Sequence, residues 1–243
     1  MFQEFLILGV GRTGSTCLVE MLDSHQEIMC LPEIFEENFA KNKDNWEKKY
    51  HDVKISENPI SNYYCLRDHA KNNNKVFGFK FLYQNENSTN ISDYNYKELL
   101  YKNPKIRKII VYRNLLETYI SDKTGELTKK WAYENTSDVK IEFDYNGYVN
   151  YCTKRLQYYY NLNLILSNSG QIPINISYSN IINTSSIKSI VKSLKLEPHI
   201  IKTNTKKQNS YFIHDRVSNY DHLVEMCTKK EDDFFQEYMS REL

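Results

Sequence analysis

Apolar runs that alternate with helical patterns are the main feature of this chain. Residues 5–10 (FLILGV) form an unbroken apolar run, which is typical of a strand buried on both faces of a parallel sheet. Leu18, Met21 and Leu22 then follow a Ser/Thr start at helical spacing. The order strand, turn, helix returns at residues 106–127, so the chain repeats a β-loop-helix unit.

The rest of the pattern extends this alternation. Apolar runs predict further strands at residues 27–31, 75–83 and 172–177. Helical spacing predicts further helices at residues 94–101, 145–166, 184–194 and 231–239. Residues 36–50 are polar and are predicted to be irregular, whereas residues 122–144 are charged and aromatic and are predicted to form a lid or acceptor-binding insertion. We therefore expect one α/β domain over residues 1–243, with a P-loop-like three-layer fold and a parallel sheet of about four or five strands flanked by helices.

The amino-acid composition argues against several classes of binding partner and of bound metal. Lys plus Arg number 32 against 31 Asp plus Glu, so the formal charge of +1 provides no global field for nucleic acid or an anionic membrane. The five cysteines include no C-x-x-C pair, which indicates neither a zinc site nor a disulfide framework, and the expected setting is the cytoplasm. No run approaches the roughly 20 apolar residues of a membrane span, and the first apolar run lacks the basic flank of a signal peptide.

A glycine-rich turn follows the first strand. Residues 9–16 read GVGRTGST, which satisfies a G-x-G-x-x-G pattern and also a P-loop pattern in which Ser15 replaces the lysine. Backbone N–H groups and the positive end of a helix dipole meet at such a turn and suit a phosphate. Without the lysine, a triphosphate loses its main cation, so Arg12 is the cation that remains in the loop.

A second candidate anion site lies about a hundred residues later. Arg113 follows the predicted strand that ends at Tyr112, and Ser121 lies two turns into the following helix. Either residue alone is ordinary for the end of a strand or the surface of a helix. Together with the lysine-free loop, they indicate a ligand that carries two separate anionic groups.

These two motifs resemble those of the sulfotransferases that use 3′-phosphoadenosine-5′-phosphosulfate (PAPS). GVGRTGST is similar to their 5′-phosphosulfate loop, and VYRNLLETYIS to their 3′-phosphate motif. The bacterial carbohydrate sulfotransferases are the most similar type, through GRTGSTCLVEMLDSHQEIMCLPEIF and FGFKFLY. The resemblance implies PAPS as donor, its bisphosphate PAP as product, no metal, and an acceptor hydroxyl on a carbohydrate or glycoconjugate.

The resemblance also implies roles for individual residues. For the 5′-phosphosulfate these are Gly11, Arg12, Thr13, Gly14, Ser15 and Thr16. For the rest of the nucleotide they are Arg113 and Ser121 at the 3′-phosphate, Tyr178 at the adenine, and Lys206 or Lys207 with Gln208 closing over it.

Catalysis is expected to depend on cations and one carboxylate. Arg12 and Lys80 are the candidates to stabilise charge on the transferred group. An acceptor hydroxyl needs a general base, and the FGFKF strand has no histidine for that role. In the bacterial carbohydrate type a glutamate after the second strand is the base; here that position is Glu33, with Glu36 and Glu37 as alternatives.

Three alternatives and one ambiguity stay open at this point. A P-loop-type nucleotide kinase lacks its lysine here, a degenerate nucleotide-binding module would bind PAP without transfer, and an NAD-type oxidoreductase leaves Arg113 and Ser121 unexplained. Aromatic residues between positions 131 and 148 suit either a flat acceptor or simple packing; they are Trp131, Tyr133, Phe143, Tyr145 and Tyr148.

Overall fold

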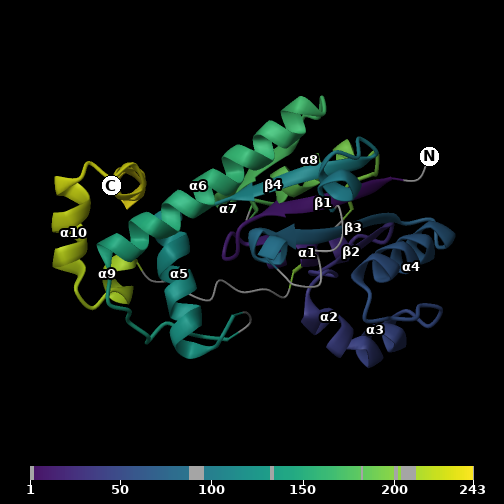
Figure 1. Cartoon of the computed structure of the whole chain (residues 1–243), viewed down its shortest axis with the longest axis horizontal. Helices are drawn as coiled ribbons and strands as arrows, with labels where there is room; N and C mark the ends of the chain where they lie inside the picture. Colours follow the sequence, from purple (N-terminus) through teal and green to yellow (C-terminus); the bar gives the residue numbers. More distant parts are fainter. Residues whose placement is uncertain are drawn as a thin grey trace. The chain divides into compact units, whose positions relative to one another are not determined.

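A computed structural model describes residues 3–87, 96–131, 134–181, 183–199, 202–203 and 212–242. The chain divides into two compact units (Figure 1). The sheet unit consists of Met1–Tyr112 and Tyr160–Asn204, and the helical unit of Arg113–Tyr159 and Thr205–Leu243. The expectation of a single domain stays a prediction.

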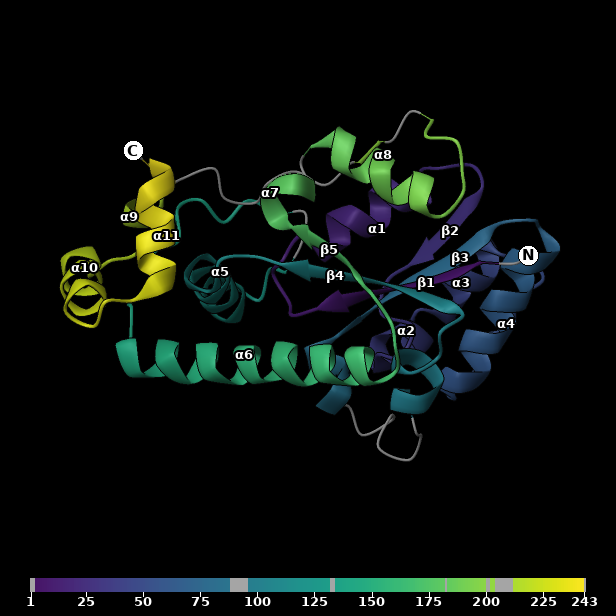
Figure 2. The same cartoon turned by 90° about the horizontal axis from the view of Figure 1, so that it is seen from above.

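A five-stranded parallel sheet forms the centre of the sheet unit, in the order β2-β3-β1-β4-β5 (Figure 2). The strands are β1 (Glu4–Gly9), β2 (Ile28–Leu31), β3 (Val76–Leu82), β4 (Ile106–Tyr112) and β5 (Ile174–Ser177). The prediction of an α/β fold with a parallel sheet is confirmed, and each predicted strand is present. Strands β1, β2 and β3 are buried along almost their whole length, as expected for strands covered on both faces, whereas β4 and β5 have exposed positions.

Helices α1 (Ser15–Asp23) and α8 (Thr184–Ser193) cover one face of this sheet. Ile7 of β1 packs in one core cluster with Leu22 of α1 and Ile187 of α8, and all three are fully buried. Both helices were predicted from their apolar spacing. Because α1 begins directly after the glycine turn, packing of its apolar side against the sheet also fixes the position of that turn.

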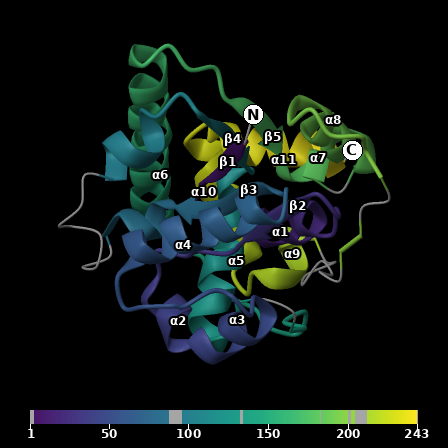
Figure 3. The ribbon, with the colours of Figure 1, turned by 90° about the vertical axis from the view of Figure 1, so that its right-hand side faces the viewer.

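Helix α4 (Pro59–Asn72) lies on the opposite side of the sheet from α8 (Figure 3). Phe79 of β3 contacts the rings of Phe35 and Tyr63, with ring centroids 5.7 and 5.8 Å apart. Asn58 caps α4 by accepting hydrogen bonds from the backbone N–H groups of Ile60 and Ser61. This aromatic layer holds the segment after β2 against the sheet.

The expectation of an irregular segment at residues 36–50 is wrong. This segment forms the short helices α2 (Glu37–Lys41) and α3 (Lys43–Lys49). Phe39 and Trp46 stack at 4.9 Å between ring centroids and join the two helices. Three aromatic side chains in this charged stretch give too weak a periodic pattern to predict helices.

Shorter elements complete the sheet unit: η1 (Tyr83–Asn87), η2 (Lys97–Tyr101) and α7 (Tyr178–Ile181). The five cysteines all lie among the described residues, and none forms a disulfide. Among the described helices, none is both long enough and apolar enough to cross a membrane.

The helical unit packs around its own core. Its helices are α5 (Leu115–Thr128), α6 (Tyr145–Asn168) as far as Tyr159, α9 (Ile213–Arg216), α10 (Tyr220–Lys229) and α11 (Asp233–Glu242). Phe143 and Tyr148 are buried against Tyr119, with ring centroids 6.0 and 5.5 Å away. These two aromatic residues therefore pack the core, whereas Trp131 is 48% exposed and Tyr133 lies outside the described residues.

Candidate active site

Four connections leave the sheet unit's strands at the same edge, because the carboxyl ends of parallel strands point the same way. The glycine turn follows β1 and Glu33 follows β2. Gln84 follows β3, and Tyr178 follows β5. This carboxyl edge is where open α/β sheets bind their ligands, so we take it as the candidate site.

The glycine turn has the backbone of an anion-binding loop. Arg12 has φ of 68° and Gly14 has φ of 82°, both in the left-handed region. Gly14 caps the nine-residue helix α1, and its carbonyl accepts the N–H of Leu18 at 3.1 Å. The buried hydroxyl of Thr13 donates to the carbonyl of Val10 at 2.8 Å and so braces the turn from inside. The N-terminus of α1 therefore opens toward the carboxyl edge with its positive dipole end.

Two side chains from neighbouring connections contact this loop. A Cβ atom on Gly14 would lie 2.7 Å from the ring of Tyr178, so the tyrosine packs directly on the loop. The N–H of Gly11 donates to Oε1 of Gln84 at 3.2 Å. The sequence singled out Tyr178 but missed Gln84, because no spacing rule relates a polar residue after β3 to a turn after β1.

Lys80 links the loop to the candidate base. This lysine is 6% exposed, and its Nζ donates to Oγ1 of Thr16 at 2.9 Å. The same Nζ lies 3.0 Å from Oε2 of Glu33. Lys80 lies in register with Ile7 of β1, on the face of the sheet that α1 covers. The structure thus brings together three predicted site residues that are far apart in the sequence.

The chain after α8 returns to helix α1. Thr203 donates to Oε2 of Glu20 at 2.9 Å and accepts the thiol of Cys17 at 3.8 Å. Burial raises the pKa of the Cys17 thiol. The predicted residues Lys206, Lys207 and Gln208 follow Thr203 in the sequence and are outside the described residues. Their assignment stays a prediction.

In the helical unit, Arg113 belongs to a charged network. Its Nη2 lies 3.4 Å from Oε1 of Glu117, whose Oε2 lies 3.4 Å from Nη1 of Arg241. The side chain of Arg113 is 10% exposed, and Ser121 on α5 is buried. Glu117 was not among the predicted site residues, although its i,i+4 spacing from Arg113 is a signal for an ion pair. An anion at Arg113 must compete with this carboxylate.

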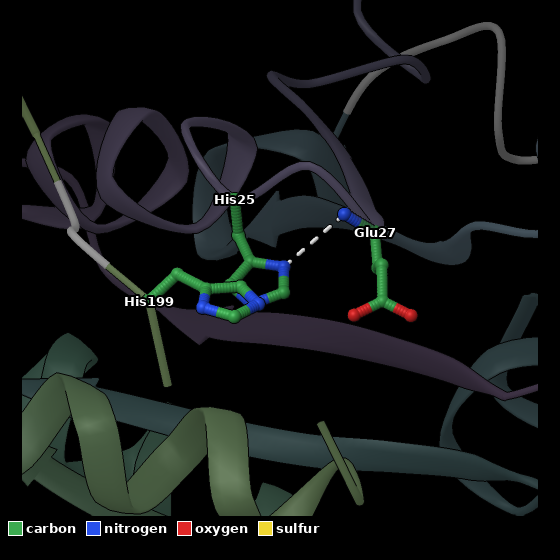
Figure 4. A group of neighbouring side chains, drawn as sticks. All are labelled: His25, Glu27 and His199. Atoms are coloured by element: carbon green, nitrogen blue, oxygen red, sulfur yellow. Dashed lines mark hydrogen bonds between the residues drawn. The ribbon is translucent and has the colours of Figure 1, made fainter. Parts of the chain in front are cut away.

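A histidine pair in the sheet unit lies near a third potential metal ligand (Figure 4). His25, Glu27 and His199 place ligand atoms within 4.8 Å of one another. Nε2 of His25 hydrogen-bonds the carbonyl of Glu197 at 2.8 Å, and its Nδ1 accepts the N–H of Glu27 at 3.2 Å. A metal bound to His25 would have to displace one of these backbone groups, so in this geometry the ring holds the turn before β2. Its stacking on His199, with 5.3 Å between ring centroids, fits the same packing role.

Comparisons with known proteins concern the family and the fold. The family model described as "Sulfotransferase family" matches residues 4–197, which is most of the chain. A search of curated protein sequences finds no match. Among solved structures, the sulfotransferase domain from the curacin biosynthetic pathway is similar with a TM-score of 0.52 and 16% identity, over 99% of this chain and 97% of that chain. At this identity the structural likeness concerns the fold alone.

Proposed function

Because the chain belongs to the sulfotransferase family, we propose that it transfers a sulfuryl group from PAPS to a hydroxyl of a carbohydrate or glycoconjugate. The observation that carries this proposal is the link from Thr16 through Lys80 to Glu33. It combines a loop hydroxyl, a buried cation and a carboxylate at one edge of the sheet. Donor binding, charge stabilisation and proton removal each need one of these groups.

Lys80 supplies the cation that the loop sequence lacks. In a P-loop the lysine follows the last glycine, where this chain has Ser15. Lys80 reaches Thr16, the next residue, from the neighbouring strand β3. The Lys80 ammonium and the N–H groups of the loop suit a phosphosulfate, which carries less charge than a triphosphate. Arg12, at the crown of the loop, is the second cation in the proposal.

In the proposed reaction, the acceptor oxygen forms a bond to sulfur while the bond from sulfur to the 5′-phosphate oxygen breaks. Glu33 accepts the proton of the acceptor hydroxyl as general base. Lys80 and Arg12 stabilise negative charge that develops on the leaving phosphate and on the sulfuryl oxygens. Lys80 also orients the Glu33 carboxylate through Oε2.

Binding of the rest of the nucleotide is proposed from the family resemblance. Arg113 and Ser121 bind the 3′-phosphate, and Tyr178 contacts the adenine. The packing of Tyr178 on Gly14 supports its assignment, since this ring lies beside the loop. Lys207 and Gln208 close over the nucleotide in the same proposal.

A thermal-shift comparison tests this function directly. We expect PAP to raise the melting temperature more than ATP with Mg²⁺ or NAD, because a ligand that binds the folded state stabilises it by mass action. A larger shift with ATP and Mg²⁺ would favour a nucleotide kinase and overturn the proposal. Binding of PAP without transfer of ³⁵S-sulfate from PAPS to any member of a hydroxylated acceptor panel would indicate a binding module instead.

A further inference from the structure

A cavity of about 210 Å³ lies beside the segment that follows β2 in the sheet unit. Its lining comes from that segment, from α2, from the connection before α4 and from the start of α4: Ile34, Phe35, Glu36, Ala40, Lys41, Glu57, Pro59 and Asn62. We propose that this α2–α4 cavity binds the sugar ring of the acceptor and selects neutral or amino-bearing rings over anionic ones. This inference rests on the proposed sulfuryl transfer, whose acceptor it specifies.

A single turn connects the cavity to the candidate base. The N–H of Glu36 donates to the carbonyl of Glu33 at 3.1 Å, so the two residues are the ends of one β-turn. The Cα atoms of the first and last residues of such a turn lie within about 7 Å of each other. Glu36 lines the cavity, whereas Glu33 binds Lys80 at the carboxyl edge. In this proposal, a ring in the cavity directs one hydroxyl toward Glu33, at the other end of the turn.

The lining has the chemistry of a sugar site. Glu36 and Glu57 provide carboxylate oxygens that accept hydrogen bonds from hydroxyl or ammonium groups. Phe35 and Pro59, both buried, form the apolar floor of the cavity. With Lys41 as the third charged residue of the lining, the net formal charge is negative, which disfavours a carboxylated or sulfated ring.

Asn62 makes one wall rigid. Its Oδ1 accepts the N–H of Ser56 at 2.8 Å, and its Nδ2 donates to the Ser56 carbonyl at 2.9 Å. Because both the oxygen and the nitrogen of this amide are hydrogen-bonded to Ser56, Asn62 contributes mainly to the shape of the cavity wall. Selectivity is therefore assigned to the two glutamates, which are exposed and can be replaced without disturbing the buried core.

The volume of the cavity limits the bound group to about one ring. At roughly 30 Å³ for each water molecule, it holds the equivalent of about seven waters. Pockets for drug-sized ligands begin at about 300 Å³. This location differs from the insertion at residues 122–144, where the sequence placed acceptor binding.

The test measures sugar binding to the full chain saturated with PAP, using saturation-transfer NMR and three probes. We expect glucosamine and glucose to bind more tightly than glucuronic acid. Glu57→Gln and Glu36→Gln should each weaken glucosamine binding about threefold to tenfold, because each removes a charge-assisted hydrogen bond. Glu225→Gln, which removes an exposed carboxylate from α10, is the matched control and should change nothing.

A separate measurement of PAP binding keeps the two proposals distinguishable. Sugar binding that is absent, that prefers glucuronic acid, or that survives the Glu36→Gln/Glu57→Gln double variant unchanged would overturn the cavity assignment. If PAP still binds in those cases, the proposed function stands and only the acceptor site is wrong. If PAP itself fails to stabilise the unsubstituted protein, the proposed function fails first.

Discussion

The Lys80 ammonium lies 3.0 Å from the Glu33 carboxylate and, at the same time, 2.9 Å from the Thr16 hydroxyl. Glu33 follows β2, whereas Lys80 lies within β3 and is almost completely buried. A buried cation with two oxygen partners holds both of them in place. The candidate base and the donor loop are therefore one coupled unit.

Replacing Glu33 with glutamine should remove transfer while leaving donor binding intact. Glutamine keeps the shape of the side chain but cannot accept the hydroxyl proton, and general-base catalysis contributes about 10²-fold to 10⁴-fold. We expect kcat to fall in that range, with the PAP-induced thermal shift within error of the unsubstituted protein. Near-normal transfer by Glu33→Gln would exclude this residue as the base and leave Glu36 as the next candidate for that role.

Lys80→Met should impair both donor binding and transfer, because it removes the cation beside Thr16 and leaves Glu33 without its partner. Residues that act as a unit have non-additive effects. The Glu33→Gln/Lys80→Met double variant should therefore lose much less kcat than the product of the two single losses. Fully multiplicative losses in steady-state kinetics would show that the two residues act independently.

Gly14→Ala should lower stability through two physical causes. Its φ of 82° costs an L-residue about 1–2 kcal/mol, and the added Cβ would meet the Tyr178 ring at 2.7 Å. A melting temperature lower by roughly 2–8 °C is expected for a chain of this size. In a protein that already carries Tyr178→Ala, the Gly14→Ala substitution should cost less stability, because the clash with the ring is gone and only the backbone strain remains. Calorimetry of the unsubstituted protein, the two single variants and the double variant separates the two causes.

Glu117→Gln should tighten PAP binding. The Glu117 carboxylate pairs with Arg113 at 3.4 Å, and a 3′-phosphate must displace it to reach the guanidinium. Removing its charge should lower the Kd of PAP several-fold but leave the Kd of 5′-AMP, which lacks the 3′-phosphate, unchanged. Isothermal titration with both nucleotides measures the difference. If Glu117→Gln changes the Kd of PAP and of 5′-AMP equally, Arg113 does not bind the 3′-phosphate.

The buried lysine on β4 should make stability depend on pH. Burial lowers the pKa of Lys108 to about 8, and its Nζ donates to the carbonyl of Asn103 and, at 2.5 Å, to Oε1 of Gln171. Between this value and the unfolded pKa of about 10.4, the unfolded state binds more protons, so the free energy of unfolding rises with pH. Over pH 8.0–9.5 the contribution of Lys108 should be about 1–2 kcal/mol.

Lys108→Met should remove that contribution. Burial raises the pKa of Cys152 and Cys227 to about 12, and these thiols have the opposite effect on stability because they ionise first in the unfolded state. The readout is therefore the difference in unfolding free energy between the two proteins, measured by urea denaturation at each pH. If the difference in unfolding free energy stays constant from pH 8.0 to 9.5, the lowered pKa of Lys108 is contradicted.

The strands and the donor loop could be predicted because their signals are local. Predominantly apolar runs marked the five strands, and Gly14 marked a left-handed backbone position that glycine adopts without steric cost. Helices α2 and α3 could not be predicted, because they depend on the stacking of Phe39 on Trp46 rather than on an apolar stripe. The α2–α4 cavity could not be predicted for the same reason, since α2 forms part of its wall.

The sequence by itself determined the alternation of strands and helices and the position of the glycine turn, because backbone preference and apolar periodicity act over a few neighbouring residues. It also identified Glu33 and Lys80 as separate candidates. Only the tertiary structure decided that they form one ion pair beside Thr16, and that Gln84 binds the loop. Parallel pairing brings the ends of β1, β2 and β3 to one edge, and contacts across that edge leave no periodic trace in the chain.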